Sequence, residues 1–463
     1  MKLSKKLADL ILSTCLKTGG DYAEIYYQDD QVSTYNRRYK KVYAYSKKHI
    51  NGVGIRILKG NKSVYGYTSD LSTKSLLSLA ESLSMGYQGE KEIDVPPLSV
   101  KKYKNINPIA IPHDQMTTEE KFAYLKEAED VAFSYSDKIC DVMASLFEED
   151  EHVEIYNSTG DIYKDDRVRT RLALLCIASD KTQFQSAFDG PGASKGLELL
   201  KETDFKDVAL KCAERACQLL SAIDGPSGEM PVIIGNGFGG VLFHEACGHP
   251  LEGTSIAHKT SPFFDKYGKK VASDVVSAVD DGTIQSAWGS ENIDDEGVKP
   301  TKNILIKDGV LVNFMVDRYN SRRIPNSVAT GSCRRQSYKY LPTTRMTNTY
   351  IDNGKSTKEE IISSVKKGIY LSGFTGGQVD PSTDKFVFTS DVGYMVEDGK
   401  ITKMIKPVTL MGYGYDILMK ISMVANDLKI APGVCGAASG SCFVSVGQPT
   451  LLVSQILVGG KGE

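Results

Sequence analysis

The stretch Pro-Val-Ile-Ile-Gly-Asn-Gly-Phe-Gly-Gly-Val-Leu-Phe-His-Glu-Ala-Cys-Gly-His-Pro-Leu-Glu-Gly occupies residues 231–253 of this chain. A β-branched run at 232–234 meets a glycine-rich turn, and residues 239–247 are good helix formers that end at Gly248 and Pro250. The pattern predicts a buried strand, a turn, and a helix with a His-Glu-x-x-x-His segment near its C-terminal end.

The spacing of the two histidines requires an irregular helix. In the common zincin motif the histidines are four residues apart, about 40° round the helix, so both rings reach one ion. His244 and His249 are five residues apart and would point about 140° apart on a regular α-helix. A π-type turn would return them to one side, and Gly248 can adopt backbone conformations closed to other residues. We therefore predict a metal site on a distorted helix end.

A third ligand is needed, because a catalytic zinc usually has three protein ligands and keeps the fourth position for water. The stretch at residues 433–451 reads Gly-Val-Cys-Gly-Ala-Ala-Ser-Gly-Ser-Cys-Phe-Val-Ser-Val-Gly-Gln-Pro-Thr-Leu. It offers Cys435 in a glycine-rich loop, with Cys442 as a rival. The residues alone leave this choice open.

Four segments form a recognisable set. They are Phe-His-Glu-Ala-Cys-Gly-His-Pro-Leu-Glu-Gly at 243–253, Arg-Arg-Gln-Ser-Tyr-Lys-Tyr-Leu-Pro-Thr-Thr-Arg-Met-Thr-Asn-Thr-Tyr at 334–350, Gly-Gly-Gln-Val-Asp at 376–380 and Val-Gly-Gln-Pro-Thr-Leu at 446–451. Together they resemble the TldD/PmbA family of zinc metalloproteases. The resemblance is close from about residue 228 to 460 and weaker before. It favours the TldD-type, metal-bearing branch, since the PmbA (TldE) branch lacks the histidine motif. The family places its cysteine ligand eleven residues before the valine of Val-Gly-Gln-Pro-Thr-Leu, which corresponds to Cys435.

This resemblance and the chemistry of the motif assign roles to four residues. His244 and His249 would bind one zinc ion per chain as neutral imidazoles, and Cys435 would bind it as a thiolate. Such an ion lowers the pKa of a water and polarises a peptide carbonyl, and Glu245 is the expected general base. Cys247, inside the motif, is expected to be a packing residue.

Other residues in and near these segments are candidates for roles outside the metal site. Arg334 and Tyr338 lie in a segment that matches the family closely, so they are candidates for substrate binding, although the sequence equally allows a core or interface position. Gly376 and Gly377 could let an extended peptide pair with a sheet edge. His258 follows Leu-Glu-Gly where the family commonly has an acidic residue, and we expect a polar loop residue there.

The composition is that of a soluble globular protein, with 41% hydrophobic and 25% charged residues and a net charge of −2. The mixed charges argue against binding to nucleic acid, and no apolar run approaches the roughly 18 to 20 residues of a membrane span. No signal peptide is evident. The nine cysteines are scattered and odd in number, which indicates reduced thiols and a cytoplasmic protein.

The chain of 463 residues is expected to adopt an α+β fold with two domains. Residues 1–225 should form an α+β domain with an antiparallel sheet and a possible subdivision near 90–115, built from two helix–meander–helix units. One helix is expected at about 196–222, a hairpin turn at 157–160, and a solvated loop at the acidic run 148–151.

Residues 226–463 should form a largely antiparallel β domain that carries the metal-site helix. Strands are expected around 271–279, and Asp-Gly pairs at 308–309 and 398–399 are hairpin signals. Helices are expected near 358–367 and 416–423.

The function that best fits these features is a cytoplasmic zinc metallopeptidase acting on unfolded or small peptides. The family works as a two-subunit assembly that encloses the active site, which implies a homodimer or a heterodimer with a PmbA (TldE)-type chain. A metal-dependent amidase on non-peptide substrates is an alternative, since the same water chemistry serves both. A non-catalytic regulator with a structural metal is another, and a fourth protein ligand such as Cys442 or His258 would favour it.

Overall fold

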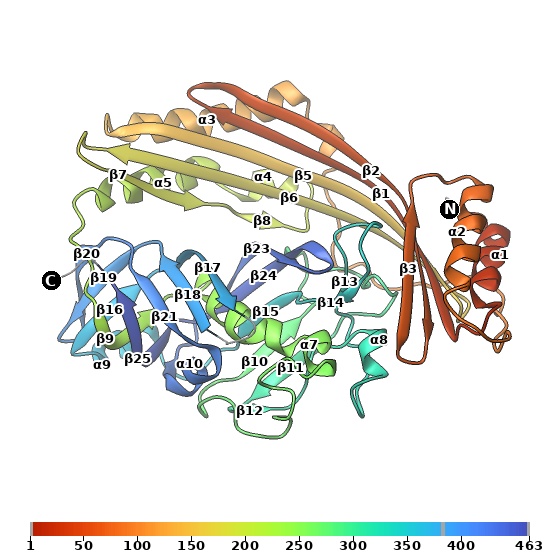
Figure 1. Cartoon of the computed structure of the whole chain (residues 1–463). Coiled ribbons are helices and arrows are strands. Elements are labelled where there is room, and N and C mark those ends of the chain that lie inside the picture. Colours follow the sequence, from red (N-terminus) through yellow and green to blue (C-terminus); the bar gives the residue numbers. More distant parts are fainter. Residues whose placement is uncertain (1–2, 381–384, 461–463) are drawn as a thin grey trace.

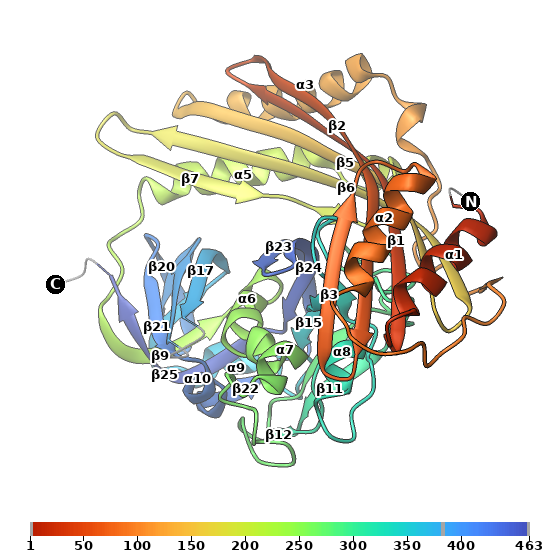
Figure 2. The same cartoon turned by 45° about the vertical axis from the view of Figure 1, so that its right-hand side comes forward.

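The computed structural model describes residues 3–380 and 385–460. A long curved sheet from the first half of the chain arches over the second half (Figures 1 and 2). The polypeptide passes from one half to the other between α5 (Phe205–Leu219) and β9 (Gly228–Ile234). The expected α+β class is confirmed.

The first sheet is continuous across the amino-terminal half. Its strand order is β3-β2-β1-β5-β6-β4, and β7 and β8 also pair with β6. The bounds are β1 (Tyr22–Arg38), β2 (Lys41–Lys59), β3 (Lys62–Thr68), β4 (Ser99–Val100), β5 (Ile139–Asn157), β6 (Asp161–Ser179), β7 (Phe184–Asp189) and β8 (Gly192–Ala193). The two expected meanders therefore form one sheet, because β1 pairs with β5 along almost its whole length.

Helices cover the outer face of this sheet (Figure 1). They are α1 (Lys5–Leu16), α2 (Thr73–Ser84), α3 (Thr118–Tyr135), α4 (Glu198–Glu202) and α5. The single helix expected at 196–222 is in fact two, because Asp204 begins α5 by accepting a hydrogen bond from the Asp207 backbone N–H. None of the described helices is both long and apolar enough to cross a membrane.

The acidic run 148–151 is not a solvated loop, and that prediction was wrong. It lies within β5, where alternate side chains face opposite sides of the sheet. Glu148 faces the helices and pairs with Lys121 of α3 at 2.8 Å, while Glu149 faces the second half of the chain and pairs with Arg169 at 2.8 Å. Basic partners distant in sequence make the burial of these acids possible.

The second half contains two larger sheets, mostly antiparallel. One has the order β17-β18-β21-β25-β9-β16-β19-β20, with β22 on β25, and the other has the order β12-β11-β10-β15-β24-β23. The first comprises β9, β16 (Lys367–Leu371), β17 (Phe374–Asp380), β18 (Lys385–Ser390), β19 (Gly393–Glu397), β20 (Lys400–Ile405), β21 (Thr409–Tyr413), β22 (Ile421–Val424) and β25 (Leu451–Gly459). The second comprises β10 (Ala278–Asp281), β11 (Lys302–Lys307), β12 (Val310–Leu311), β15 (Asn348–Ile351), β23 (Lys429–Ala437) and β24 (Gly440–Gln448).

Smaller elements complete this half. They are the two-strand ladder β13 (Cys333–Arg334) and β14 (Thr343–Thr344), and the helices α8 (Arg318–Ser321), α9 (Lys358–Ser364) and α10 (Gly414–Lys420). Both expected Asp-Gly hairpins are confirmed, with φ of 47° and 80° at 308–309 and 48° and 72° at 398–399. Of the strand expected at 271–279, only the end near Ala278 is part of β10.

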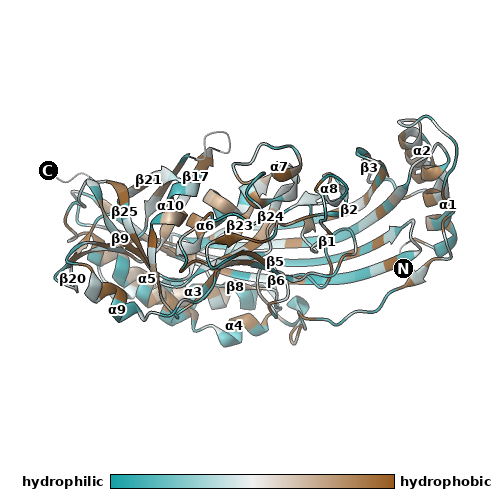
Figure 3. Ribbon diagram, turned by 90° about the horizontal axis from the view of Figure 1, so that it is seen from below, coloured by the Kyte–Doolittle hydropathy of each residue, from teal (hydrophilic) through white to brown (hydrophobic). Residues whose placement is uncertain are grey.

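Apolar and polar residues alternate along the strands (Figure 3), and the inward residues of both larger sheets share one core. Val232 and Ile234 of β9 pack in this core with Phe243 and Ala246 of the helix that follows. The segment that carries the histidines is thus held between the two sheets.

Candidate metal centre

The helix after β9 is irregular along its whole length. It consists of 3₁₀ turn η2 (Phe238–Gly240), α6 (Val241–Phe243), π-helical turn η3 (His244–Gly248), 3₁₀ turn η4 (His249–Leu251) and α7 (Gly253–Ala257). The expected π-type turn is therefore present between the two histidines. Pro250, which cannot donate a backbone hydrogen bond, lies directly after it.

Gly248 is needed here for a reason other than the expected one. Its φ of −57° is ordinary helical backbone, so conformational freedom is not required. A Cβ at this position would lie 2.2 Å from the Met346 sulfur. The glycine therefore makes room for β15 and its preceding loop to pack against the helix.

Gly240 anchors the start of the same helix. A Cβ there would lie 2.4 Å from the Gly447 backbone, so the glycine-rich turn and the Val-Gly-Gln-Pro segment of β24 are in direct backbone contact. This contact brings the hairpin of β23 and β24 beside the histidines.

The structure brings the three predicted ligands together. Ligand atoms of His244, His249 and Cys435 all lie within 4.8 Å of one another. The Cys435 Sγ is 3.1 Å from His249 Nε2, and the two imidazole rings have centroids 5.1 Å apart at 81°. A side chain on β23 thus meets His249, which directly follows the π-turn, although 186 positions separate the two residues in the sequence.

The electrostatics of this cluster suit a bound cation. Burial lowers the pKa of His244 well below its usual value, which keeps the imidazole neutral, and its Nδ1 is buried without a hydrogen-bond partner among the described residues. Burial would also lower the pKa of His249, but Glu252 and Cys435 outweigh it and raise that pKa. The surroundings therefore favour positive charge at this point, and a His-His-Cys donor set fits zinc.

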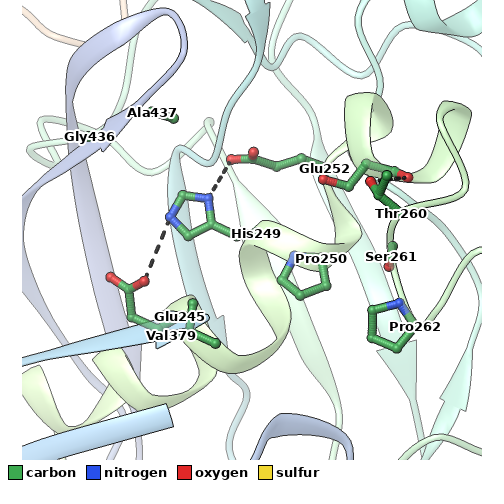
Figure 4. A pocket seen from close by; sticks show the side chains of 11 residues that line it. Glu245, His249, Pro250, Glu252, Thr260, Ser261, Pro262, Val379, Gly436 and Ala437 are labelled. Carbon is green, nitrogen blue, oxygen red and sulfur yellow. Dashed lines mark hydrogen bonds and ion pairs between the residues drawn. The ribbon is translucent and has the colours of Figure 1, made fainter. Parts of the chain in front are cut away.

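Glu245 lines a cavity of about 520 Å³ beside the cluster. Its carboxylate is 3.9 Å from His249 Nε2, and burial raises its pKa. Figure 4 shows Glu245 and Glu252 on opposite sides of the His249 ring, with Val379 of β17 and Gly436 of β23 at the cavity wall. A carboxylate so placed can exchange a proton with a molecule in the cavity.

Sequence reasoning missed two residues that lie beside the predicted ligands. Glu252 Oε1 lies 3.3 Å from His249 Nδ1 and 3.9 Å from Arg345 Nε. Arg345 is fully buried and donates from Nη2 to the Cys435 carbonyl oxygen at 2.5 Å. The pair thus links a histidine ligand to the cysteine ligand. An acid three residues after His249 was a visible signal, whereas nothing in the sequence marks Arg345.

The rival residues lie outside the cluster. Cys442 is directly opposite Cys435 in the hairpin, but its Sγ accepts a hydrogen bond from Arg345 Nη1 at 3.5 Å. His258 is exposed and lies 3.0 Å from Arg323 Nη1, and Cys247 is buried in the core as expected. Within the described ranges, the cluster therefore offers three ligands and no fourth.

Tyr338 lies in the contact between the two halves of the chain, whereas the polar contacts of Arg334 are within the second half. Arg334 pairs with Glu291 at 2.8 Å and donates to the Met346 carbonyl oxygen at 3.0 Å. Tyr338 is buried beside Tyr26 of the long sheet. Neither is among the residues that line the metal cavity, so substrate binding by these two residues stays a prediction.

Gly376 and Gly377 lie in β17, an edge strand whose Val379 lines the metal cavity. A Cβ at Gly376 would meet nothing within 4 Å, whereas one at Gly377 would lie 1.8 Å from the Phe388 ring. The strand is therefore open on one face and closely packed on the other, and it runs past the cavity.

Known proteins match the chain over most of its length. The PmbA/TldA metallopeptidase domains match at residues 23–85 (domain 1), 111–220 (central domain) and 227–460 (C-terminal domain). The Metalloprotease TldD homolog of Haemophilus influenzae is 38% identical, over 95% of this chain and 93% of that protein. The Zinc metalloprotease TldD homolog of Saccharolobus solfataricus is 27% identical, over 68% of this chain and 70% of that protein. In fold, the chain is similar to TldE from Thermococcus kodakarensis, with a TM-score of 0.75 and 18% identity over 95% of this chain and 97% of that chain.

Proposed function

This chain belongs to the PmbA/TldD family of metallopeptidases, and on that premise we propose that it is a zinc-dependent peptidase acting on unfolded or small peptides. The observation that carries this proposal is the convergence of three ligand atoms within 4.8 Å of one another, beside a cavity lined by Glu245. The coarser conclusion, a TldD-type metalloprotease, follows from the family alone.

One zinc ion per chain would be held by His244, His249 and Cys435. Bound there, zinc supplies Lewis acidity that makes a water more acidic and polarises a peptide carbonyl. Three protein ligands are typical of catalytic rather than structural zinc sites. The relative from Saccharolobus solfataricus that carries zinc in its name supports this choice of metal.

The residues of the chain have separate tasks in this proposal. Glu245 accepts the proton of the attacking water and passes it to the leaving amine. Glu252 orients the His249 ring through Nδ1, as carboxylates next to metal-binding histidines commonly do. The open edge of β17 at Gly376 and Gly377 pairs with the backbone of an extended substrate, so binding depends little on the substrate sequence.

Loss of the base tests the mechanism. Glu245→Gln should reduce the cleavage of an unfolded peptide pool by about 10² to 10⁴-fold, because the general base is lost, and should keep one zinc per chain. Glu359→Gln, on the exposed start of α9, is the matched control. Metal quantification and peptide cleavage are measured on both, and a Glu245 variant with full zinc and full activity would refute the assignment. Parallel assays on small amides distinguish a peptidase from an amidase.

We also propose that the protein is cytoplasmic and works as a dimer, with a second copy or with a TldE-type chain. All nine cysteines are free in the described structure, as expected for a reducing compartment. Sedimentation velocity of the chain alone and mixed with a TldE-type chain should show a species of about twice the monomer mass in one of the two samples. A monomer in both would contradict the assembly.

A further inference from the structure

A second cavity, of about 360 Å³, lies between the long sheet and the second half of the chain. Its walls come from β7 and the segment after it, from the start of β17 and from the start of β23. Both β17 and β23 lie on the side of the second half that faces the long sheet (Figure 2). The cavity wall is largely apolar, with Phe188, Phe374 and Ile430, and it contains Arg171.

Arg171 lacks the carboxylate that its neighbours on β6 possess. Three arginines at alternate positions of β6 face the second half, and their register partners on β5 are Glu151 for Arg167, Glu149 for Arg169 and Phe147 for Arg171. The first two arginines form ion pairs with these glutamates at 3.5 and 2.8 Å. At the third position the opposing side chain is a phenyl ring, so the guanidinium has no acid across the strand.

The other contacts of Arg171 do not neutralise it. Its Nη2 donates to the Pro432 carbonyl oxygen at a long 3.5 Å, its guanidinium lies 5.8 Å from the centre of the Trp288 ring, and its Nε is buried without a hydrogen-bond partner. Burial lowers its pKa, and no acid among the described residues offsets this. A partly buried guanidinium in this condition is a site for an anion from outside the chain.

The other charges at this cavity are already engaged. Arg215 pairs with Asp189 at 3.2 Å, and Asp391 accepts hydrogen bonds from Ser372 Oγ at 2.9 Å and from the Val392 N–H at 2.5 Å. Of the basic side chains that line this cavity, Arg171 is therefore the one without an ion pair among the described residues.

The same two strands connect this cavity with the metal cavity. Thr375 of β17 and Pro432 of β23 line the second cavity, while Val379 and Gly436 on the same strands line the metal cavity. Four residues separate the two points on each strand, which corresponds to roughly 13 Å of extended chain. Both strands are sheet edges, so a peptide that extends beside them from one cavity to the other contains about four residues.

We propose that Arg171 binds the C-terminal carboxylate of the substrate, with the scissile bond at the metal centre about four residues upstream. The inference rests on the proposed peptidase function and adds a substrate class to it, namely peptides with a free C-terminus and an apolar last residue. The carboxylate lies at the start of β17 and the scissile bond near its end, so the substrate runs antiparallel to β17 and β23. Hydrolysis then adds OH to the acyl carbon and H to the amine nitrogen, and releases a C-terminal fragment of about four residues.

The test compares peptides that differ only at the C-terminus. Ten-residue peptides with leucine at the end are supplied to the zinc-loaded protein as free acids and as C-terminal amides, together with an amide that ends in glutamate. We expect kcat/KM to be about 10 to 100-fold higher for the free acid than for the leucine amide, as for a charge-assisted contact of about 1.5–3 kcal/mol. The main cut should lie about four residues from the C-terminus. Cleavage of the glutamate amide at the rate of the free acid would overturn the assignment to the main-chain terminus.

Variants connect this preference to Arg171. Arg171→Met should remove the difference between acid and amide, and Arg171→Lys should keep part of it. Arg38→Met, on the same sheet but paired with Asp141 at 2.6 Å, should leave the ratio unchanged. Thermal unfolding confirms that each variant is folded. If Arg171→Met does not fold, the ratio of acid to amide cleavage is compared between the wild type and Arg171→Lys instead. Equal rates for acid and amide in the wild type, or an unchanged ratio in Arg171→Met, would overturn the proposal.

A binding assay separates failure of this inference from failure of the peptidase function. Fluorescent four-residue peptides, as acid and amide, are titrated into zinc-loaded Glu245→Gln protein. The acid should bind about 10 to 100-fold more tightly, and Arg171→Met in that background should abolish the difference. Equal binding contradicts the carboxylate site even if peptides are cleaved. Preferential binding of the acid without any cleavage in the wild type contradicts the peptidase function alone.

Discussion

Cys435 and Cys442 face each other in the β23–β24 hairpin and are both only 4% exposed, yet their surroundings differ. Cys435 lies 3.1 Å from His249 Nε2, whereas Cys442 lies 3.5 Å from the Arg345 guanidinium. At the residue scale, therefore, position in the hairpin does not distinguish a ligand from a packing residue. The residue that contacts each sulfur distinguishes them: it is His249 for Cys435 and Arg345 for Cys442.

This pair provides a matched prediction. Cys435→Ser should lower zinc affinity by more than about 100-fold, beyond the effect of losing a residue that only supports a ligand. Cys442→Ser should retain the affinity, because the hydroxyl can still accept from Arg345. Competition with a chromogenic chelator measures both. Equal losses in the two variants would mean that the thiolate assignment is wrong.

At the scale of one element, contacts with neighbouring strands shape the metal-site helix. Its π-turn places two histidines five apart on one side, and it is held at both ends by glycines that allow close approach. Gly240 meets the Gly447 backbone, which cannot move without disturbing β24, while Gly248 meets the flexible side chain of Met346. The helix is therefore shaped by packing against the second sheet as much as by its own sequence.

Alanine substitutions should reveal this difference. Gly240→Ala should lower the free energy of unfolding by about 3 kcal/mol, at the upper end for an overpacked core. Gly248→Ala should have a smaller effect because the Met346 side chain can rotate. Gly436→Ala, where an added Cβ meets nothing within 4 Å, is the control. Urea unfolding midpoints rank the three, and a larger loss for Gly248→Ala than for Gly240→Ala would contradict this account.

At the scale of the whole molecule, buried ion pairs join the two halves. Arg167 pairs with Asp295 at 2.8 Å, Arg169 with Glu291 at 3.0 Å, and Arg335 with Glu24 at 3.1 Å. Within the second half, Arg334 also pairs with Glu291 at 2.8 Å and so supports the contact of Glu291 with Arg169. Each of the acids in these pairs meets a basic residue that is far away in the sequence, so the pairs between the halves form only when the long sheet packs on the second half.

Arg334→Met tests this interface. Glu291 keeps Arg169 as a partner, but the buried groups that accept from Arg334 lose their donor, and the free energy of unfolding should fall by about 1–3 kcal/mol. Arg322→Met is the comparison, because it removes an ion pair with Asp21 that also joins the halves but is partly exposed. This variant should change the free energy of unfolding by about 0–1 kcal/mol. Chemical denaturation measures both, with KM determined at the same time. A raised KM at unchanged stability would instead support the substrate contact predicted for Arg334.

Much of the local structure was predictable from the sequence. The strand and helix at 231–253 and the need for a π-turn follow from the spacing of His244 and His249, and the hairpins follow from Asp-Gly pairs that adopt positive φ. These features depend on residues a few positions apart, whose geometry is set by backbone sterics and helical periodicity. The choice of Cys435 came from family resemblance, since spacing alone left Cys442 open.

The sequence by itself determined which elements form and which side chains in the motif can bind a metal. Only the tertiary structure decided that two meanders make one sheet, that Glu148, Glu149 and Glu151 are buried, and that Glu252 and Arg345 lie beside the predicted ligands. It also placed Tyr338 between the halves, buried Arg334 beside Glu291 in the second half, and left Arg171 without an acid. The physical reason is that burial, ion pairing and metal-site geometry depend on which distant residues become neighbours, and a linear pattern contains no direct record of those contacts.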